Sequence, residues 1–225
     1  MISWATLADV GTAAGTLVLA GATFVSVRAS ARSTRIAQRA LLAGQRPVLA
    51  PAGRGDPAES VQFADGRVFP VPSGQALAVQ EPGVIYLAIP LCNVGAGLAM
   101  LNGYHLQGKP ASDVARDPRG AARHLRGDPP PGPRAFSRQQ RDLLISTRRP
   151  GFWQAALRDP QSPLYDEVAR AISTGGRVTV DVLYGDHEGG QPAVTRFVLL
   201  PEAGSWRCDA TRHWSLPALG ASSVA

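Results

Sequence analysis

The sequence predicts a mainly β protein. We expect an N-terminal transmembrane helix followed by a two-layer antiparallel β-sandwich, immunoglobulin-like, with two short helices inserted. Three observations support this fold class. Residues 10–27 form an 18-residue run without a charged side chain. Residues 84–92, VIYLAIPLC, are apolar on both faces, as in a central strand buried by a second layer. Residues 178–214 contain three strand-like segments separated by turns of hairpin length, which predicts an antiparallel meander.

The uncharged run is long enough to cross a bilayer, since a membrane-spanning helix needs about 20 residues. We expect the span to cover about residues 5–27. A cleaved secretory signal would need a positively charged leading segment, but residues 1–9 contain no Lys or Arg. A buried soluble helix is the other alternative, because several Gly and Thr residues make the run only moderately apolar.

A series of arginines follows the run: Arg28, Arg32, Arg35, Arg39 and Arg46. Positive charge next to a span is retained on the cytoplasmic side. We therefore expect the N-terminus outside the cell membrane and the β domain in the cytoplasm. On a continuing helix these side chains fall within a stripe of roughly 60°. The stripe predicts contact with anionic lipid headgroups, and ordinary stop-transfer charges are the equal alternative.

The span also contains a GxxxG pattern, formed by Gly11 and Gly15. Small residues at this spacing let two membrane helices approach closely. The pattern is therefore typical of a homodimer held together through the transmembrane helix, although Gly and Ala are common in such helices in any case.

The chain divides into three parts. Residues 1–45 are predicted to form the anchor and a basic juxtamembrane helix, and residues 46–217 the β-sandwich domain. Residues 218–225 are expected to be a disordered tail. Within the domain, a stretch at about 108–135 is rich in Pro, Gly, Asp and Arg. It contains almost no large apolar residue, so it predicts a mobile loop.

Further elements follow from local pattern. A hairpin is expected around Asp65-Gly66, a dipeptide favoured in tight turns. Residues 98–106 are interpreted as a strand returning alongside 84–92, and residues 139–147 as another strand. Short helices are expected at Phe152–Leu157 and Leu164–Ile172. In the last strand, simple alternation places five residues on one face: Trp206, Cys208, Ala210, Arg212 and Trp214.

The net charge of +6 is unevenly distributed. Residues 116–149 hold nine arginines and three acids, whereas the flanking parts of the domain are mildly acidic. This pattern suits a protein held near an anionic surface better than a nucleic-acid reader, which would interleave basic and aromatic residues. Cys92 and Cys208 match no zinc pattern, and in a reducing cytoplasm we expect free thiols within strands.

Candidate functional residues gather near the first turn of the meander. Tyr184, Asp186, His187 and Glu188 surround this turn, and His213 lies on a neighbouring strand. Such a group could bind a divalent metal or act as general acid and base, but these residues are also ordinary components of a solvated turn. No catalytic residue, metal ligand or cofactor is assigned. The binding candidates are Tyr184, His187, Arg196, His213 and Trp214.

Three segments carry a family resemblance: YLAIPLCNVGAGLA, GFWQAALRDP and VLYGDHEGGQPAVTRFVLLPEAGSWRCDATRHW. They resemble an uncharacterised family of bacterial, chiefly actinobacterial, single-pass membrane proteins. Asn93-Val94-Gly95 is also similar to the bend in immunoglobulin-like adhesion and scaffold modules of bacteria. The resemblance spans about residues 1–217. It implies a membrane-tethered sandwich and supplies no catalytic residue.

The expected function is therefore a protein-interaction or accessory module at the inner face of the cytoplasmic membrane, binding a protein partner of unknown identity. No enzymatic activity is predicted. Two alternatives stay open. One is an enzyme with an unrecognised site near the 184–188 hairpin. The other is a lipid or nucleic-acid binder that uses the arginine-rich strips 28–46 and 116–149.

Overall fold

The computed structural model describes residues 4–116, 128–187 and 191–217. The predicted tail and the middle of the predicted 108–135 loop lie outside the described residues. The chain divides into two units, residues 1–44 and 45–225, and each is described by itself.

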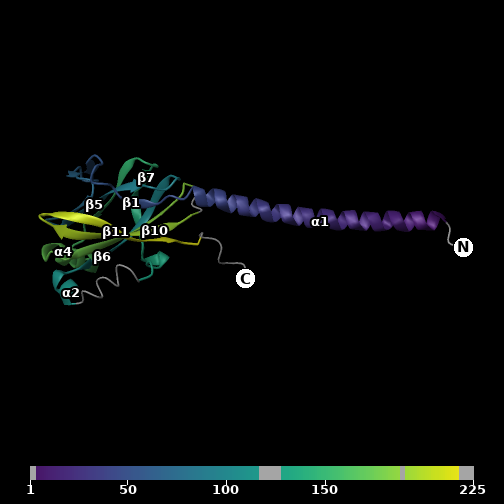
Figure 1. Cartoon of the computed structure of the whole chain (residues 1–225). Helices are drawn as coiled ribbons and strands as arrows, with labels where there is room; N and C mark the ends of the chain where they lie inside the picture. Colours follow the sequence, from purple (N-terminus) through teal and green to yellow (C-terminus); the bar gives the residue numbers. More distant parts are fainter. Residues whose placement is uncertain (1–3, 117–127, 188–190, 218–225) are drawn as a thin grey trace. The chain divides into compact units, whose positions relative to one another are not determined.

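The first unit contains one unbroken helix, α1 (Trp4–Gly44), drawn in purple and blue in Figure 1. It ends shortly before Pro47, because a residue that precedes proline disfavours the α conformation. Large apolar side chains between Leu17 and Val27 are exposed. Within the residues whose side chains the structure describes, no helical stretch is both long enough and apolar enough to span a membrane.

The second unit is built on one curled antiparallel sheet (Figure 1). Its central strand is β5 (Val84–Asn93), which pairs with β8 (Pro150–Leu157) along one edge. The other edge of β5 is shared by β4 (Gln75–Glu81) and β1 (Leu49–Pro51). From β4 the order continues through β11 (Ser205–Ser215), β10 (Ala193–Glu202), β9 (Arg177–Gly185), β6 (Ala99–Lys109) and β7 (Ser137–Ile145). The prediction of a mainly β, antiparallel domain is confirmed.

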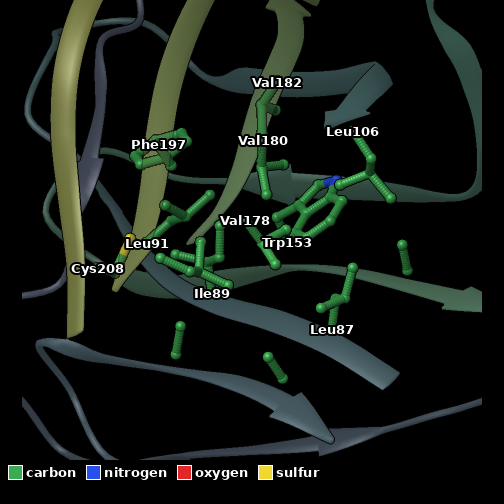
Figure 2. Close-up of a cluster of buried hydrophobic side chains, with 14 of the residues drawn as sticks. Leu87, Ile89, Leu91, Leu106, Trp153, Val178, Val180, Val182, Phe197 and Cys208 are labelled. Atoms are coloured by element: carbon green, nitrogen blue, oxygen red, sulfur yellow. The ribbon is translucent and has the colours of Figure 1, made fainter. Parts of the chain in front are cut away.

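The main core lies inside the curl of the sheet (Figure 2). β5 and β9 contribute alternate apolar residues that are fully buried, and β8 and β10 add large aromatic side chains. The principal members are Leu87, Ile89, Leu91, Trp153, Val178, Val180, Val182 and Phe197. Burying a large apolar side chain contributes about 1.5–3 kcal/mol, so this cluster is the main source of stability for the domain.

A separate hairpin covers the other side of β5. It consists of β2 (Glu59–Gln62) and β3 (Val68–Val71), and it confirms the hairpin predicted around Asp65-Gly66. Val61, Phe63 and Val71 pack on Tyr86 and Ala88 of β5. This second cluster explains why residues 84–92 are apolar on both faces.

Residues Phe152–Leu157 form a strand, so the helix predicted there is wrong. They belong to β8 and pair with β5 along their whole length. Trp153 and Ala155 face the main core, whereas Phe152 and Ala156 pack in the cluster under the hairpin. Only Gln154 interrupts the apolar residues of this short segment, so its periodicity cannot distinguish a strand from a helix.

The strand expected at 98–106 exists as β6, but it does not return beside β5. It pairs with β9 on one edge and β7 on the other. The connection after β5 therefore carries the chain to the opposite wall of the core. This pairing depends on the long-range placement of β9, which is about 80 residues away in the chain.

Asn93 holds the connection after β5 in place. The side chain is buried, and its Oδ1 accepts hydrogen bonds from the Val48 and Gly95 amides at 3.1 and 3.0 Å. Its Nδ2 donates to the carbonyls of Gly97 and Ile145. A Cβ on Gly97 would overlap the carbonyl oxygen of Gln45. Asn93 and Gly97 thus clamp the segment through which the chain enters the domain.

One of the two predicted helices is confirmed as α4 (Pro163–Ser173). Pro163 occupies its first turn, where the missing amide hydrogen is tolerated. Tyr165, Val168 and Ala171 are buried in the main core. Two short elements also lie within the predicted loop, α2 (Ala111–Arg116) and the 3-10 turn η1 (Pro133–Ala135).

Both cysteines are free thiols in strands, as predicted. Cys208 is buried in the main core (Figure 2), and desolvation raises the pKa of its thiol far above the usual range. It therefore stays uncharged and behaves as a small apolar residue.

Candidate functional site

A β-bulge in the meander divides the predicted binding residues into two groups. The β9–β10–β11 meander itself is confirmed. In β11, Ala210 pairs with Phe197 but Arg212 pairs with Arg196, so Thr211 is the inserted residue. Its hydroxyl donates to the Arg196 carbonyl at 3.3 Å. An extra residue shifts every later side chain to the opposite face. Arg212 and Trp214 therefore do not share a face with Cys208, and that prediction is wrong.

The first group lies on the inner side of the sheet and centres on the fully buried Tyr184. The Tyr184 hydroxyl lies 2.9 Å from Thr195 Oγ1 and 3.1 Å from His213 Nδ1. It also accepts a hydrogen bond from the Leu49 amide at 3.1 Å. These contacts connect side chains of β9, β10 and β11 to the main chain of β1.

The titration of this group favours uncharged side chains. Desolvation raises the pKa of Tyr184 above its ordinary value. Desolvation also lowers the pKa of His213, and the nearby positive charge of Arg46 adds to that effect. At neutral pH the pair is thus a neutral hydrogen-bonded network, which suits a structural role.

The second group lies on the outer side of the same strands. Arg196 Nε and Nη2 donate to the two carboxylate oxygens of Asp181 at 2.6 and 2.9 Å. The indole of Trp214 contacts two guanidinium groups, with Arg196 at 5.0 Å and Arg212 at 5.5 Å from the ring centroid. Asp181, Arg196, Trp214 and Arg212 thus form a row of charged and aromatic side chains, in which Arg212 is exposed.

A cleft of about 240 Å³ borders this row of side chains. Its floor is formed by β6, β9 and β10, and Pro129 and Pro131 of the segment before η1 form part of its wall. His105, Arg177 and Asp181 are the titratable side chains of the floor next to Arg196. Desolvation and the charge of Arg196 lower the pKa of Arg177. Asp128 also lines the cleft, and its charge acts in the opposite direction on the pKa of Arg177. The two guanidinium groups are therefore matched by the two carboxylates of Asp128 and Asp181.

Sequence reasoning missed His105, Arg177 and Asp181 as parts of a site. A signal was available for Asp181, because it interrupts the apolar strand VTVDVLYG. A buried carboxylate needs a cationic partner. The sequence does not identify that partner, because the partner depends on the β9–β10 register, which places Arg196 opposite Asp181.

His187 lies exposed at the turn after β9, and Glu188 falls outside the described residues. The structure brings Tyr184 and His213 together, but it places Arg196 and Trp214 on the opposite side of the sheet. In the described ranges, no three His, Cys, Asp or Glu side chains lie close enough to hold a metal ion.

The arginines after the uncharged run have different surroundings. Arg28, Arg32 and Arg35 are exposed on α1. Arg46 lies beyond the end of that helix and donates to Gln191 Oε1 at 2.8 Å and to the Ser215 hydroxyl at 3.2 Å. The side chain of Arg39 and the surroundings of Gly11 lie outside the described part of α1.

Comparison with protein-family models, with curated proteins and with solved structures gives no match for this chain.

Proposed function

We propose that this protein is a membrane-anchored β module that binds a protein partner at the inner face of the cytoplasmic membrane. In this proposal α1 crosses the bilayer with the N-terminus outside. The β domain, for which we propose an immunoglobulin-like two-layer sandwich fold, lies on the cytoplasmic side. The protein then has two functional parts, the anchor α1 and a recognition surface on the β domain, and a separate observation supports each.

The observation that carries the anchor is the distribution of apolar side chains around α1. Leu17, Val18 and Leu19 are consecutive and are 74%, 73% and 69% exposed. Three consecutive residues cover about 200° of a helix surface. A protein surface packs against one stripe of a helix, whereas lipid surrounds all of it. The uncharged run to which these residues belong starts at Val10, before the first residue whose side chain is described.

The residues at the end of the uncharged run support an orientation with the N-terminus outside. The guanidinium of Arg28 lies over the ring of Phe24, 5.6 Å from its centroid. An arginine directly after an apolar run is typical of the cytoplasmic end of a membrane span, and the cation–π contact holds its guanidinium beside the helix. Arg32 and Arg35 continue this charge along α1, where anionic headgroups would attract each of them by about 1 kcal/mol.

The proposed recognition surface is the outer face of β10 and β11 around Trp214. Trp and Arg are enriched among the residues that dominate binding energy at protein interfaces. Arg212 is exposed beside the indole, and the guanidinium of Arg196, which also contacts the ring, is held by its buried ion pair with Asp181. A partner with acidic residues next to an apolar anchor would complement this surface.

Carbonate extraction of membranes tests the anchor. We expect the full-length chain to stay with the membrane pellet. A chain with both Leu17→Arg and Leu19→Arg should move to the soluble fraction, because a central arginine costs about 2.5–3.5 kcal/mol on insertion. Leu41→Arg is the matched control, since Leu41 is also exposed on α1, at 63%, but lies beyond the uncharged run. Recovery of the unchanged chain in the soluble fraction would refute the anchor.

Fusions test the orientation. Alkaline phosphatase placed after Ala225 should be inactive, and a fluorescent protein at the same position should be fluorescent. The opposite pair of results would place the β domain outside the cell membrane.

A further inference from the structure

Two loops at one end of the β domain are held against each other by hydrogen bonds. One loop follows β5 and the other joins β7 to β8, and they comprise residues 94–98 and 146–149. The Arg148 amide donates to the carbonyl of Asn93, the last residue of β5, at 3.2 Å. The Thr147 hydroxyl donates to the Ala96 carbonyl at 2.9 Å. The two loops therefore form one surface.

The segment through which the chain enters the β domain belongs to the same surface. The Val94 amide donates to the Val48 carbonyl at 2.8 Å, and the Ala96 amide donates to the Arg46 carbonyl at 3.2 Å. These bonds hold the first loop beside the residues that directly follow α1. We call this surface the entry tip, and it comprises residues 45–48, 94–98 and 146–149.

The entry tip combines an exposed apolar side chain with exposed positive charges. Val94 is 64% exposed, more than any other large apolar side chain in the described part of the β domain. Arg46, Arg148 and Arg149 are exposed as well. Arg148 has a φ of 59°, a left-handed conformation that is unfavourable for a residue with a Cβ. Because such strained residues cluster at functional sites, an arginine in this conformation indicates a role for its side chain.

The entry tip itself contains no acidic residue, since none of its three segments includes Asp or Glu. The turn between β9 and β10 lies next to it, because Arg46 donates to Gln191 Oε1 at 2.8 Å. In that turn Asp186 is only 8% exposed, and Glu188 lies outside the described residues. Exposed arginines beside an apolar side chain are complementary to an anionic membrane surface. Its headgroups attract the guanidinium groups, and its boundary with the acyl chains accepts the apolar side chain.

We propose that the entry tip docks the β domain on the anionic membrane surface, with Arg148 and Arg149 among the headgroups and Val94 at the apolar boundary. This inference rests on the proposed function, because the anchor α1 is what brings the domain to the membrane. From Arg28 to Gly44, α1 continues for about 25 Å. An upright helix would hold the entry tip away from the headgroups, so docking requires this part of α1 to lie along the membrane. The predicted arginine stripe favours that arrangement.

A fluorescent label on the entry tip tests the docking in the full-length chain reconstituted into bilayers. Ala96→Cys in a Cys92→Ser background gives an exposed labelling position and keeps Val94, whereas Cys208 is buried. In bilayers that mix phosphatidylserine with phosphatidylcholine, the emission should shift to the blue, and spin-labelled lipid should quench it. Both effects should be lost in phosphatidylcholine alone and weakened by high salt, because the attraction is electrostatic.

A second labelling position controls for general contact between the domain and the membrane. Gln161 is exposed beyond the far end of β8, whose first residue, Pro150, directly follows the entry tip. A label on Gln161→Cys in the same Cys92→Ser background should stay unquenched in every bilayer.

Charge variants assign the docking to particular residues. Arg148→Gln/Arg149→Gln should weaken the docking equilibrium roughly thirtyfold, and the phosphatidylserine-dependent quenching should be lost with it. Arg134→Gln/Arg138→Gln is the matched control, because it removes two exposed arginines near the start of β7, whereas Arg148 and Arg149 follow its end. The control should be quenched as strongly as the unchanged chain. Val94→Ser removes the apolar contact without a change of charge, and it should also reduce the quenching.

Three results would overturn this inference. They are a label at position 96 that stays unquenched in phosphatidylserine bilayers, equal quenching at positions 96 and 161, and unchanged quenching in Arg148→Gln/Arg149→Gln. An entry tip that binds an acidic protein instead of lipid would give the first result.

Carbonate extraction separates a failure of docking from a failure of the anchor. If the chain stays with the membrane pellet and the label is unquenched, the anchor holds and only the docking is refuted. If the chain is recovered in the soluble fraction, co-flotation with phosphatidylserine vesicles takes the place of quenching. Flotation that Arg148→Gln/Arg149→Gln abolishes would then support the entry tip, and absent or unchanged flotation would refute it.

Discussion

Arg196 and Asp181 form a two-pronged ion pair on the outer side of the sheet, with Nε–Oδ1 and Nη2–Oδ2 distances of 2.6 and 2.9 Å. Both side chains are nearly inaccessible, at 9% and 2% exposure. They face each other because Arg196 of β10 is in register with Asp181 of β9. The pair also fixes the guanidinium against which Trp214 packs, so it links the stability of the sheet to the proposed recognition surface.

Removing one member of this pair should be strongly destabilising. We expect Arg196→Met to lower the free energy of unfolding by about 3–5 kcal/mol, because it leaves Asp181 buried without its main partner. The double variant Asp181→Leu/Arg196→Met should recover most of that loss, since two apolar side chains can replace a buried pair. Denaturant unfolding followed by tryptophan fluorescence measures both.

An exposed ion pair provides the control for that experiment. Arg207 and Asp209 lie 3.3 Å apart and are each about 40% exposed. Arg207→Met should change the free energy of unfolding by less than about 1 kcal/mol. If the double variant of the buried pair is as unstable as Arg196→Met, the loss does not come from an unpaired carboxylate.

Asn93 of β5, which holds the segment through which the chain enters the domain, is expected to be sensitive to substitution. Asn93→Ala leaves two amide donors and two carbonyl acceptors without their side-chain partner, and each buried unpaired group costs about 1–3 kcal/mol. We therefore expect the free energy of unfolding to fall by more than about 3 kcal/mol, measured by denaturant unfolding. Asn102→Ala, at an exposed position of β6, should have an effect within about 0.5 kcal/mol.

The Asp65 network should give the domain a defined response to acid. The folded pKa of Asp65 is lowered from 3.8 to about 2, chiefly by the hydrogen bond from Tyr86. A carboxyl with a lowered folded pKa stabilises the protein above its unfolded pKa, and this stabilisation disappears as the pH falls through the folded pKa. The contribution of Asp65 is thus complete above about pH 4 to 5 and is lost towards pH 2.

Comparison of thermal unfolding between pH 7 and pH 2 tests this response. Asp65→Asn should lower the unfolding temperature at pH 7 and reduce the additional loss seen between pH 4 and pH 2. Asp159→Asn is a suitable control, because Asp159 lies in an exposed loop. If the wild type and Asp65→Asn decline in parallel through that pH range, other carboxyl groups are responsible for the acid sensitivity.

Much of the β domain could be predicted from local patterns. The hairpin around Asp65-Gly66, the α4 helix and the β9–β10–β11 meander each depend on residues close together in the chain, and local pattern predicts all three. The helix expected for Phe152–Leu157 is wrong for a physical reason. Burial on both sides removes the alternation that identifies a strand, and only the pairing of β8 with β5 supplies the missing information.

The candidate site was predicted less well, because a single inserted residue changes which side chains share a face. Thr211 turns Trp214 to the outer side and leaves His213 beside Tyr184. Neither strand pattern shows where a bulge falls, since that depends on the register between β10 and β11. The pairing of Asp181 with Arg196 follows from register in the same way.

Sequence alone therefore determined the features that depend on a few neighbouring residues. These are the uncharged run and its arginines, the antiparallel β character and the turns, because hydrophobic pattern and backbone preference are local. The tertiary structure decided which walls β5 and β6 occupy, which side chains meet across the bulge, and which loops lie beside the entry segment. Those features depend on contacts between segments distant in the chain, whose alignment no short window of sequence contains.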